Sequence, residues 1–278
     1  MSFARNPMIL LHLAVAALYA LAAWSYWPGP TSREREPAAP LPPAFTRWML
    51  PLAIVGHAGL ALMDVAQPEG MDLSIANALS VVAWLTVVLA WASGLLRTLP
   101  VVGSILLPVT AIAAVLPLLF TNPHRFPYTG NVLATAHIAI AFVAYAMFII
   151  AAIDALVLIG LEKRLHRRLP DPGAADLPPL LTLERFLFRL IGAGFVLLTL
   201  TMFSGMLFSE QIFGRPVTLT HKSIFSMLGW VTFGALLWGR WRYGWRGRVA
   251  LRWILTGTTF LFFAYLGYKF VLEVILQR

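Results

Sequence analysis

The residues of this chain that could do chemistry are its histidines. The sequence contains six histidines and no cysteine. Without cysteine the chain cannot form a disulfide, an iron–sulfur cluster, a thiolate zinc site or a CxxC thiol relay. A neutral imidazole is a ligand of haem iron, and haem needs only two axial nitrogens. Binding of a metal or of haem by histidine is therefore the chemistry that the composition favours.

Four of the six histidines lie within or at the ends of hydrophobic stretches: His12, His57, His137 and His221. A polar side chain is costly in such a stretch, so each of these residues is a candidate for function. No HxxxH pair occurs, and zinc has no further support in the sequence. A single histidine in a membrane helix can also have a purely structural role, in which it forms a hydrogen bond to a neighbouring helix. We consider this structural role the stronger interpretation for His12 and His57.

The composition identifies an integral membrane protein and excludes a soluble enzyme. Of 278 residues, 59% are hydrophobic and 12% are charged, and the mean hydropathy is +0.78. That charged share is about half of what a soluble protein carries. We predict an all-α membrane protein, a polytopic bundle of about eight transmembrane helices in a single integral membrane domain over residues 1–278. Its predicted spans, each bounded by Pro, Gly or charge, are 8–27, 48–66, 73–94, 101–120, 131–161, 186–208, 221–238 and 253–276.

The distribution of basic residues predicts the orientation. Fifteen of the 21 lysines and arginines fall on the side that holds the loop around residues 240–252, and six fall on the other side. The positive-inside rule makes that loop cytoplasmic and both termini periplasmic. The net charge of +9 is then a topology signal, which excludes nucleic acid as a partner and leaves membrane lipid. Asp154, near the cytoplasmic end of the fifth predicted span, is expected to meet water or a basic loop.

This topology brings His137 and His221 to the outer side of the membrane. The fifth predicted span starts near Asn131, so His137 lies about two turns into it at 1.5 Å per residue, and the seventh span starts at His221 itself. These two residues could supply the two axial nitrogens of a haem iron, although spacing alone does not decide this, since a histidine that opens a helix can also be a simple interfacial residue. His12 and His57 are the alternative ligands.

Other side chains near this pair could complete a haem site. Tyr145 and Trp230 could supply aromatic walls for the porphyrin. The haem propionates need basic partners, and Arg125, Arg215 and Lys222 lie on the same predicted side.

Three segments of the C-terminal half resemble a known family. They read LATAHIAIAFVAYAMFIIAAIDALVLIGLEKRL (133–165), LPPLLTLERFLFRLIGAGFVLLTLTMFSG (177–205) and THKSIFSMLGWVTFGALLWGRWRYGWRGRVALRW (220–253). They resemble the cytochrome c assembly membrane family, which is related to the haem-handling CcsA and CcmC proteins, and within it the YpjD-like branch. The resemblance covers residues 131–276, and its more specific parts are the THK opening and the GWRGR loop.

The resemblance implies a multi-pass protein of the bacterial inner membrane that binds haem b. Such a protein assists cytochrome c biogenesis by handling or delivering haem at the periplasmic side. Its implied partners are haem and other cytochrome c maturation proteins or the apocytochrome. We expect no enzymatic activity, because the chain has no thiol and no evident acid–base pair. In the family, histidines on the outer side flank the haem, and His137 and His221 match them.

One segment departs from the better-known members of the family. Those members carry a tryptophan-rich outer segment that ends in an aspartate. The equivalent residues here, 209–220, read SEQIFGRPVTLT and contain no tryptophan. A role in haem binding fits this difference better than a role in haem attachment.

Two other classes of function stay open on sequence alone. A membrane b-type cytochrome that passes electrons to or from quinone needs a second histidine pair, for which only His12 and His57 remain. A cofactor-free transporter or accessory scaffold would show inverted repeats and helices broken near mid-membrane. Pro108 and Pro117 interrupt the fourth predicted span, but no second half matches it.

Overall fold

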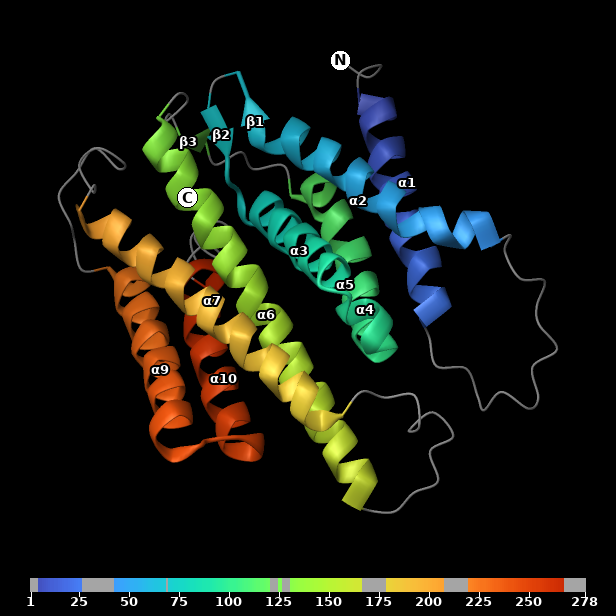
Figure 1. Ribbon diagram of the computed structural model, residues 1–278. Coiled ribbons are helices and arrows are strands. Elements are labelled where there is room, and N and C mark those ends of the chain that lie inside the picture. Colours follow the sequence, from blue (N-terminus) through green and yellow to red (C-terminus); the bar gives the residue numbers. More distant parts are fainter. Residues whose placement is uncertain are drawn as a thin grey trace. The chain divides into compact units, whose positions relative to one another are not determined.

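The structure, a computed structural model, describes residues 5–26, 43–68, 70–120, 125–126, 131–166, 179–207 and 220–267 (Figure 1). Over these residues each of the eight predicted spans falls on a helix. Within this described part of the chain, six helices are long and apolar enough to cross a membrane, namely α1, α2, α3, α5, α6 and α7. The prediction of an all-α, multi-pass membrane protein is therefore confirmed. The side of the membrane on which each terminus lies stays a prediction.

The chain divides into two compact units, Met1–Phe126 with Pro170–Leu177, and Pro127–Leu169 with Pro178–Arg278. We call them the N-terminal unit and the C-terminal unit. The N-terminal unit contains α1 (Arg5–Tyr26), α2 (Pro43–Val65), α3 (Ile75–Ala92), α4 (Leu95–Thr98) and α5 (Pro100–Leu119). It also contains a small antiparallel sheet of β1 (Ala66–Gln67), β2 (Gly70–Asp72) and β3 (Arg125–Phe126), in that order.

In the N-terminal unit α1 packs against α2 and α5, and α3 packs against the same two helices. The approach of α1 to α5 is close, since a Cβ on Gly103 would lie 2.8 Å from the ring of Tyr26. α5 continues through Pro108 and Pro117. Membrane helices tolerate such prolines because neighbouring groups satisfy the freed carbonyls, so the interruption expected here does not end the helix.

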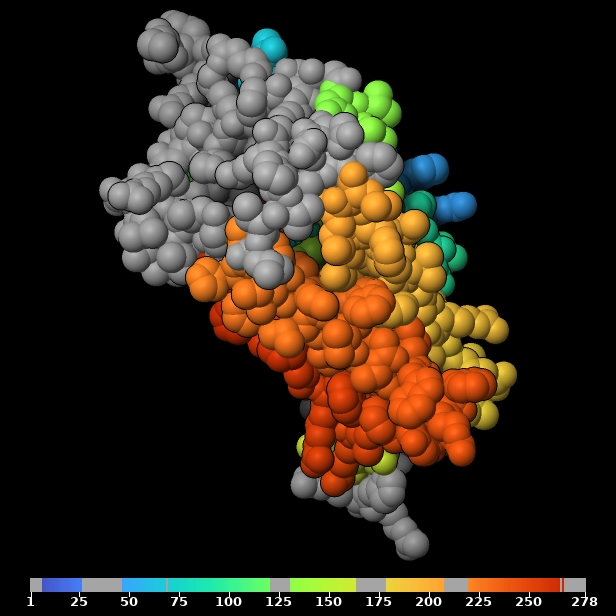
Figure 2. Space-filling view, turned by 90° about the vertical axis from the view of Figure 1, so that its left-hand side faces the viewer, coloured from blue at the N-terminus to red at the C-terminus, as the bar shows by residue number. Residues whose placement is uncertain are grey.

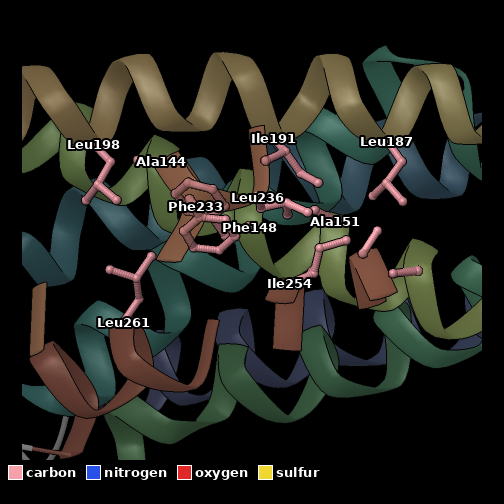
Figure 3. Close-up of a cluster of buried hydrophobic side chains, with 12 residues drawn as sticks. Ala144, Phe148, Ala151, Leu187, Ile191, Leu198, Phe233, Leu236, Ile254 and Leu261 are labelled. Carbon is pink, nitrogen blue, oxygen red and sulfur yellow. The ribbon is translucent and has the colours of Figure 1, made fainter. Parts of the chain in front are cut away.

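The C-terminal unit contains α6 (Val132–His166), α7 (Leu180–Leu207), α9 (His221–Tyr243) and α10 (Gly247–Phe262), followed by the π-helical turn η2 (Phe263–Gly267). α6 packs along α7 and α10, and α9 packs against α7 and α10. All four helices contribute to one apolar cluster (Figure 3): Ala144, Phe148, Ala151, Ala155, Leu187, Ile191, Leu198, Phe233, Leu236, Ala250, Ile254 and Leu261. At its centre the rings of Phe148 and Phe233 are stacked, with centroids 3.9 Å apart.

α10 begins six residues earlier than the predicted span, at Gly247 rather than at residue 253. The charges of Arg248 and Arg252 set the start of the predicted apolar span at residue 253. Arginine is nevertheless a good helix former and does not end a helix. Hydropathy therefore located the apolar part of this helix and missed its first turns.

Candidate functional site

His137 lies near the start of α6 and is held by the neighbouring helix α7. Its Nδ1 is 2.8 Å from Oγ of Ser204. The hydroxyl of Ser204 donates its own hydrogen to the carbonyl of Thr201, at 3.1 Å. With the hydroxyl hydrogen of Ser204 on the Thr201 carbonyl, Ser204 accepts a hydrogen from His137, so that Nδ1 carries the proton and the lone pair of the neutral ring is on Nε2. A hydrogen bond on one imidazole nitrogen that fixes the tautomer of the other is the usual arrangement of a metal-ligating histidine.

The backbone of α7 also approaches this imidazole closely. A Cβ built on Gly205 would lie 3.2 Å from Cε1 of His137. Ser204 and Gly205 thus form the surface of α7 that contacts the imidazole of His137. Neither residue was among the predicted site residues, although a Ser-Gly pair near a helix end is a recognisable sign of close helix contact in membranes.

Lys222 connects His137 to a group of aromatic side chains. The charge of Lys222, on α9, is close enough to act on the imidazole of His137. Nζ of Lys222 is 5.6 Å from the ring centroid of Tyr265, which belongs to η2. The Tyr265 ring in turn makes edge contacts with Phe142 at 5.9 Å and with Tyr145 at 6.1 Å. We call this group, His137 with Ser204, Lys222, Tyr265 and Tyr145, the His137 site.

The structure gives the two predicted aromatic residues well-defined partners. The hydroxyl of Tyr145 donates to the carbonyl of Leu261 at 3.0 Å and so joins α6 to α10. The indole of Trp230 donates to Oγ1 of Thr199 at 2.9 Å, and its ring stacks on Phe195. Tyr145 thus belongs to the aromatic group around Tyr265, about 12 Å along α6 from His137, whereas Trp230 fixes α9 to α7 about 7.5 Å along the helix axis from Ser204.

His221 is the first residue of α9 and is exposed. Thr220 caps this helix, since its hydroxyl accepts a hydrogen bond from the backbone of Ser223. The side chain that follows His221 is Lys222, which belongs to the His137 site. The structure thus brings His221 to the end of the C-terminal unit at which α6 begins and α7 ends.

The structure does not describe the side chains of the two arginines that were predicted to bind the haem propionates. Arg125 lies in β3 of the N-terminal unit, where its backbone pairs with that of Asp72, and its side chain is outside the described residues. Arg215 also lies outside the described residues. Of the three predicted basic partners, Lys222 is the one whose side chain the structure places beside His137.

The alternative ligands His12 and His57 are buried in the N-terminal unit. His12 is 1% exposed and joins three helices: its Nδ1 donates to the carbonyl of Ala114 at 2.7 Å, and its Nε2 is 3.5 Å from a carboxylate oxygen of Asp64. His57 has its Nε2 2.8 Å from Oγ of Ser80. To ligate iron, His12 would have to give up one of its two contacts. No group of three or more His, Cys, Asp or Glu that could hold a metal ion occurs among the described residues.

Asp154 differs from the sequence expectation. Its side chain is fully buried in α6, and neither carboxyl oxygen has a hydrogen-bond partner within the described residues. The expectation that Asp154 meets water or a basic loop is therefore wrong. The reason is that α6 continues to His166, so that Asp154 lies three turns before the end of the helix.

Comparison with known proteins gives consistent results. The family profile described as cytochrome C assembly protein matches residues 51–276, so the match includes α2, α3 and α5 as well as the C-terminal helices. The inner membrane protein YpjD of Escherichia coli (strain K12) is 31% identical over 232 residues, which cover 81% of this chain and 85% of that protein. An uncharacterized 28.8 kDa protein of Azospirillum brasilense is 31% identical over 230 residues, 82% of this chain and 84% of that protein.

A more distant relative carries a functional name. The cytochrome c biogenesis protein CcsA of Thermosynechococcus vestitus is 24% identical over 277 residues, 81% of this chain and 86% of that protein. No solved structure matches the chain.

Proposed function

Because the chain belongs to the cytochrome c assembly protein family, we propose that it is a haem-binding protein of cytochrome c biogenesis in the bacterial inner membrane. His137 and His221 are the proposed axial ligands of a haem b, and the His137 site is on the periplasmic side. The observation that carries the proposal is the hydrogen bond of His137 to Ser204, which holds the imidazole through Nδ1 and leaves the lone pair of the neutral ring on Nε2.

The residues around His137 suit a bound haem. Tyr145, Tyr265 and Phe142 supply an aromatic wall of the kind that packs against a porphyrin. Lys222 supplies a positive charge for a propionate carboxylate. His221 is exposed at the start of α9 and can move to bind or release a ligand more easily than a buried histidine.

Each residue has a separate task in this proposal. When bound, haem would supply a redox-active iron and the vinyl groups to which the thiols of an apocytochrome c add when the thioether bonds of a cytochrome c form. Ser204 and Gly205 orient the imidazole of His137, and Lys222 holds a carboxylate. The chain itself makes no covalent bond to haem, since it has no thiol. The proposed partners are haem, the apocytochrome and other maturation proteins, together with membrane lipid.

The cytochrome alternative would use a second histidine pair in the N-terminal unit. His12 and His57 are there, but His12 is bound to Ala114 and Asp64, and His57 is bound to Ser80. Nδ1 of His57 has no hydrogen-bond partner in the described residues, but both ring nitrogens of His12 are in contact with other groups. A second ligand pair would therefore have to break one of the contacts of His12, which favours one haem over two.

The test is a spectrum of the full-length protein in mild detergent, oxidised and then reduced with dithionite, as purified and after addition of hemin. We expect a Soret band that weakens in His137→Ala and in His221→Ala. His166→Ala is the matched control, because His166 is at the far end of α6 from His137. A Soret band of equal strength in all three variants would overturn the proposal.

A further inference from the structure

We propose that the turn between α9 and α10 binds the headgroups of anionic phospholipids. We call residues 239–252 the arginine turn; its binding residues are Arg242, Arg246, Arg248 and Arg252. This inference does not depend on haem binding, because the arginine turn is at the opposite end of α9 from His221 and Lys222.

A fifth arginine holds the turn in place. The guanidinium of Arg240 donates to a carboxylate oxygen of Glu184 on α7 and to the carbonyl of Trp245, at 3.1 Å in the second case. It also lies over the ring of Phe188, 4.4 Å from the centroid. Arg240 is thus neutralised inside the C-terminal unit and fixes the turn to α7.

Aromatic packing completes the turn. The ring of Trp245 lies against Gly239, where a Cβ would come within 2.2 Å of it. The same ring stacks on Trp253 at 5.3 Å and on Tyr243 at 6.2 Å. Gly244 has φ 67° and reverses the chain in the left-handed region that glycine adopts without strain. The turn is therefore preorganised rather than a loose connection.

The remaining arginines are exposed and have no acidic neighbour in sequence. Arg242, Arg246, Arg248 and Arg252 are all exposed, and the chain has no acidic residue between Glu210 and Glu273. The surface of α9 and of the first turns of α10, orange to red-orange in Figure 2, faces the viewer and is uncovered in that view. Four positive charges therefore lie within 11 residues, fixed on a rigid turn.

Large aromatic side chains surround these charges. Trp241 is 81% exposed and Trp238 is 55% exposed. Tryptophan with an exposed ring is enriched at the level of the lipid headgroups, where its apolar ring and its N–H both find partners. The guanidinium group of arginine binds phosphate oxygens through two parallel hydrogen bonds. Exposed arginines next to exposed tryptophans thus match the phosphate layer of a membrane with a negative surface charge.

The experiment uses the full-length protein in nanodiscs of phosphatidylcholine with a minor fraction of spin-labelled phosphatidylglycerol. Electron paramagnetic resonance gives the selectivity of the protein for the labelled anionic lipid over labelled phosphatidylcholine. We expect wild type to prefer phosphatidylglycerol and R246Q/R248Q to lose about fivefold in selectivity for each arginine replaced.

A matched control separates this site from general charge. Arg185 and Arg189 are exposed on α7, so R185Q/R189Q removes the same charge elsewhere in the C-terminal unit, and we expect a smaller loss. R246K/R248K keeps the charge and is expected to keep most of the selectivity. The proposal is overturned by an equal loss in both glutamine variants, or by a lysine variant as weak as R246Q/R248Q. It is also overturned if wild type does not prefer phosphatidylglycerol, a result that would point to an acidic protein segment instead.

Discussion

His137 and Ser204 join α6 to α7 through a hydrogen bond of 2.8 Å between Nδ1 and Oγ. The hydroxyl of Ser204 also lies 3.1 Å from the carbonyl of Thr201, and when it donates there it accepts the hydrogen of Nδ1. The tautomer of His137 is therefore set by a neighbour that is 67 residues away in sequence. The first prediction follows from this dependence.

Replacing Ser204 by alanine leaves Nδ1 of His137 without its acceptor, so the ring can rotate and change tautomer. Loss of such a supporting group costs about 10- to 100-fold in the affinity of a histidine for its metal. We expect S204A to bind hemin at least about tenfold more weakly than wild type in a Soret titration. T201A is the control, since it removes a hydroxyl from the same helix but leaves the backbone carbonyl that Ser204 uses. Equal affinities of S204A and wild type would show that Ser204 does not position His137.

Gly205→Ala tests the close approach of α7 to the imidazole. The new Cβ would lie 3.2 Å from Cε1 of His137, so the ring has to move by a few tenths of an ångström. We expect weaker hemin binding and a shifted Soret maximum. Gly192→Ala is the matched control on the same helix, because a Cβ there meets nothing within 4 Å. G192A should bind hemin as wild type does and stabilise the helix by up to about 1 kcal/mol. A parallel change in both variants would assign the effect to the helix rather than to the contact.

His12→Ala distinguishes a packing role from a ligand role. The side chain is 1% exposed and links α1 to Ala114 on α5 and to Asp64 on α2. Its removal leaves a cavity and an unpaired carboxylate contact, so the free energy of unfolding should fall by about 2–4 kcal/mol. Thermal unfolding in detergent measures this change, with His166→Ala as the control. The result that contradicts the packing role is a lost Soret band with unchanged thermal stability.

Gly239→Ala tests the rigidity of the arginine turn. The added methyl would overlap the ring of Trp245, which is itself held between Tyr243 and Trp253. Overpacking of this kind costs about 1–3 kcal/mol. We expect a lower unfolding temperature for G239A and an equal or higher one for Gly160→Ala, where a Cβ on α6 meets nothing within 4 Å and alanine favours the helix. If G239A unfolds like wild type, Trp245 does not fix the turn.

The sequence was sufficient to predict the class of fold and the position of the helices. Apolar runs bounded by Pro, Gly or charge follow from the thickness of the membrane, and every predicted span lies on a helix over the described residues. The first turns of α10 were missed because hydropathy reports where a chain is apolar and not where it is helical.

The surroundings of the histidines could not be predicted in the same way. The contact of His137 with Ser204 depends on how α6 and α7 are aligned along each other. The same alignment places Gly194 of α7 next to the ring of Phe148 of α6. Periodicity along one helix does not determine which residues of a second helix lie opposite. For the same reason the burial of Asp154 could not be read from its place near one end of a hydrophobic run.

The π-helical turn Phe263–Gly267 has a consequence for how this chain is aligned with its relatives. A π turn contains one residue more than an α turn of the same helix, and this residue rotates everything after it by about 100°. Tyr265 meets Lys222 within that turn. A relative whose α10 is α-helical throughout will therefore match this chain correctly only with a one-residue gap between Phe263 and Gly267. Without the gap, residues aligned within this turn would be compared with ones from a different face of the helix.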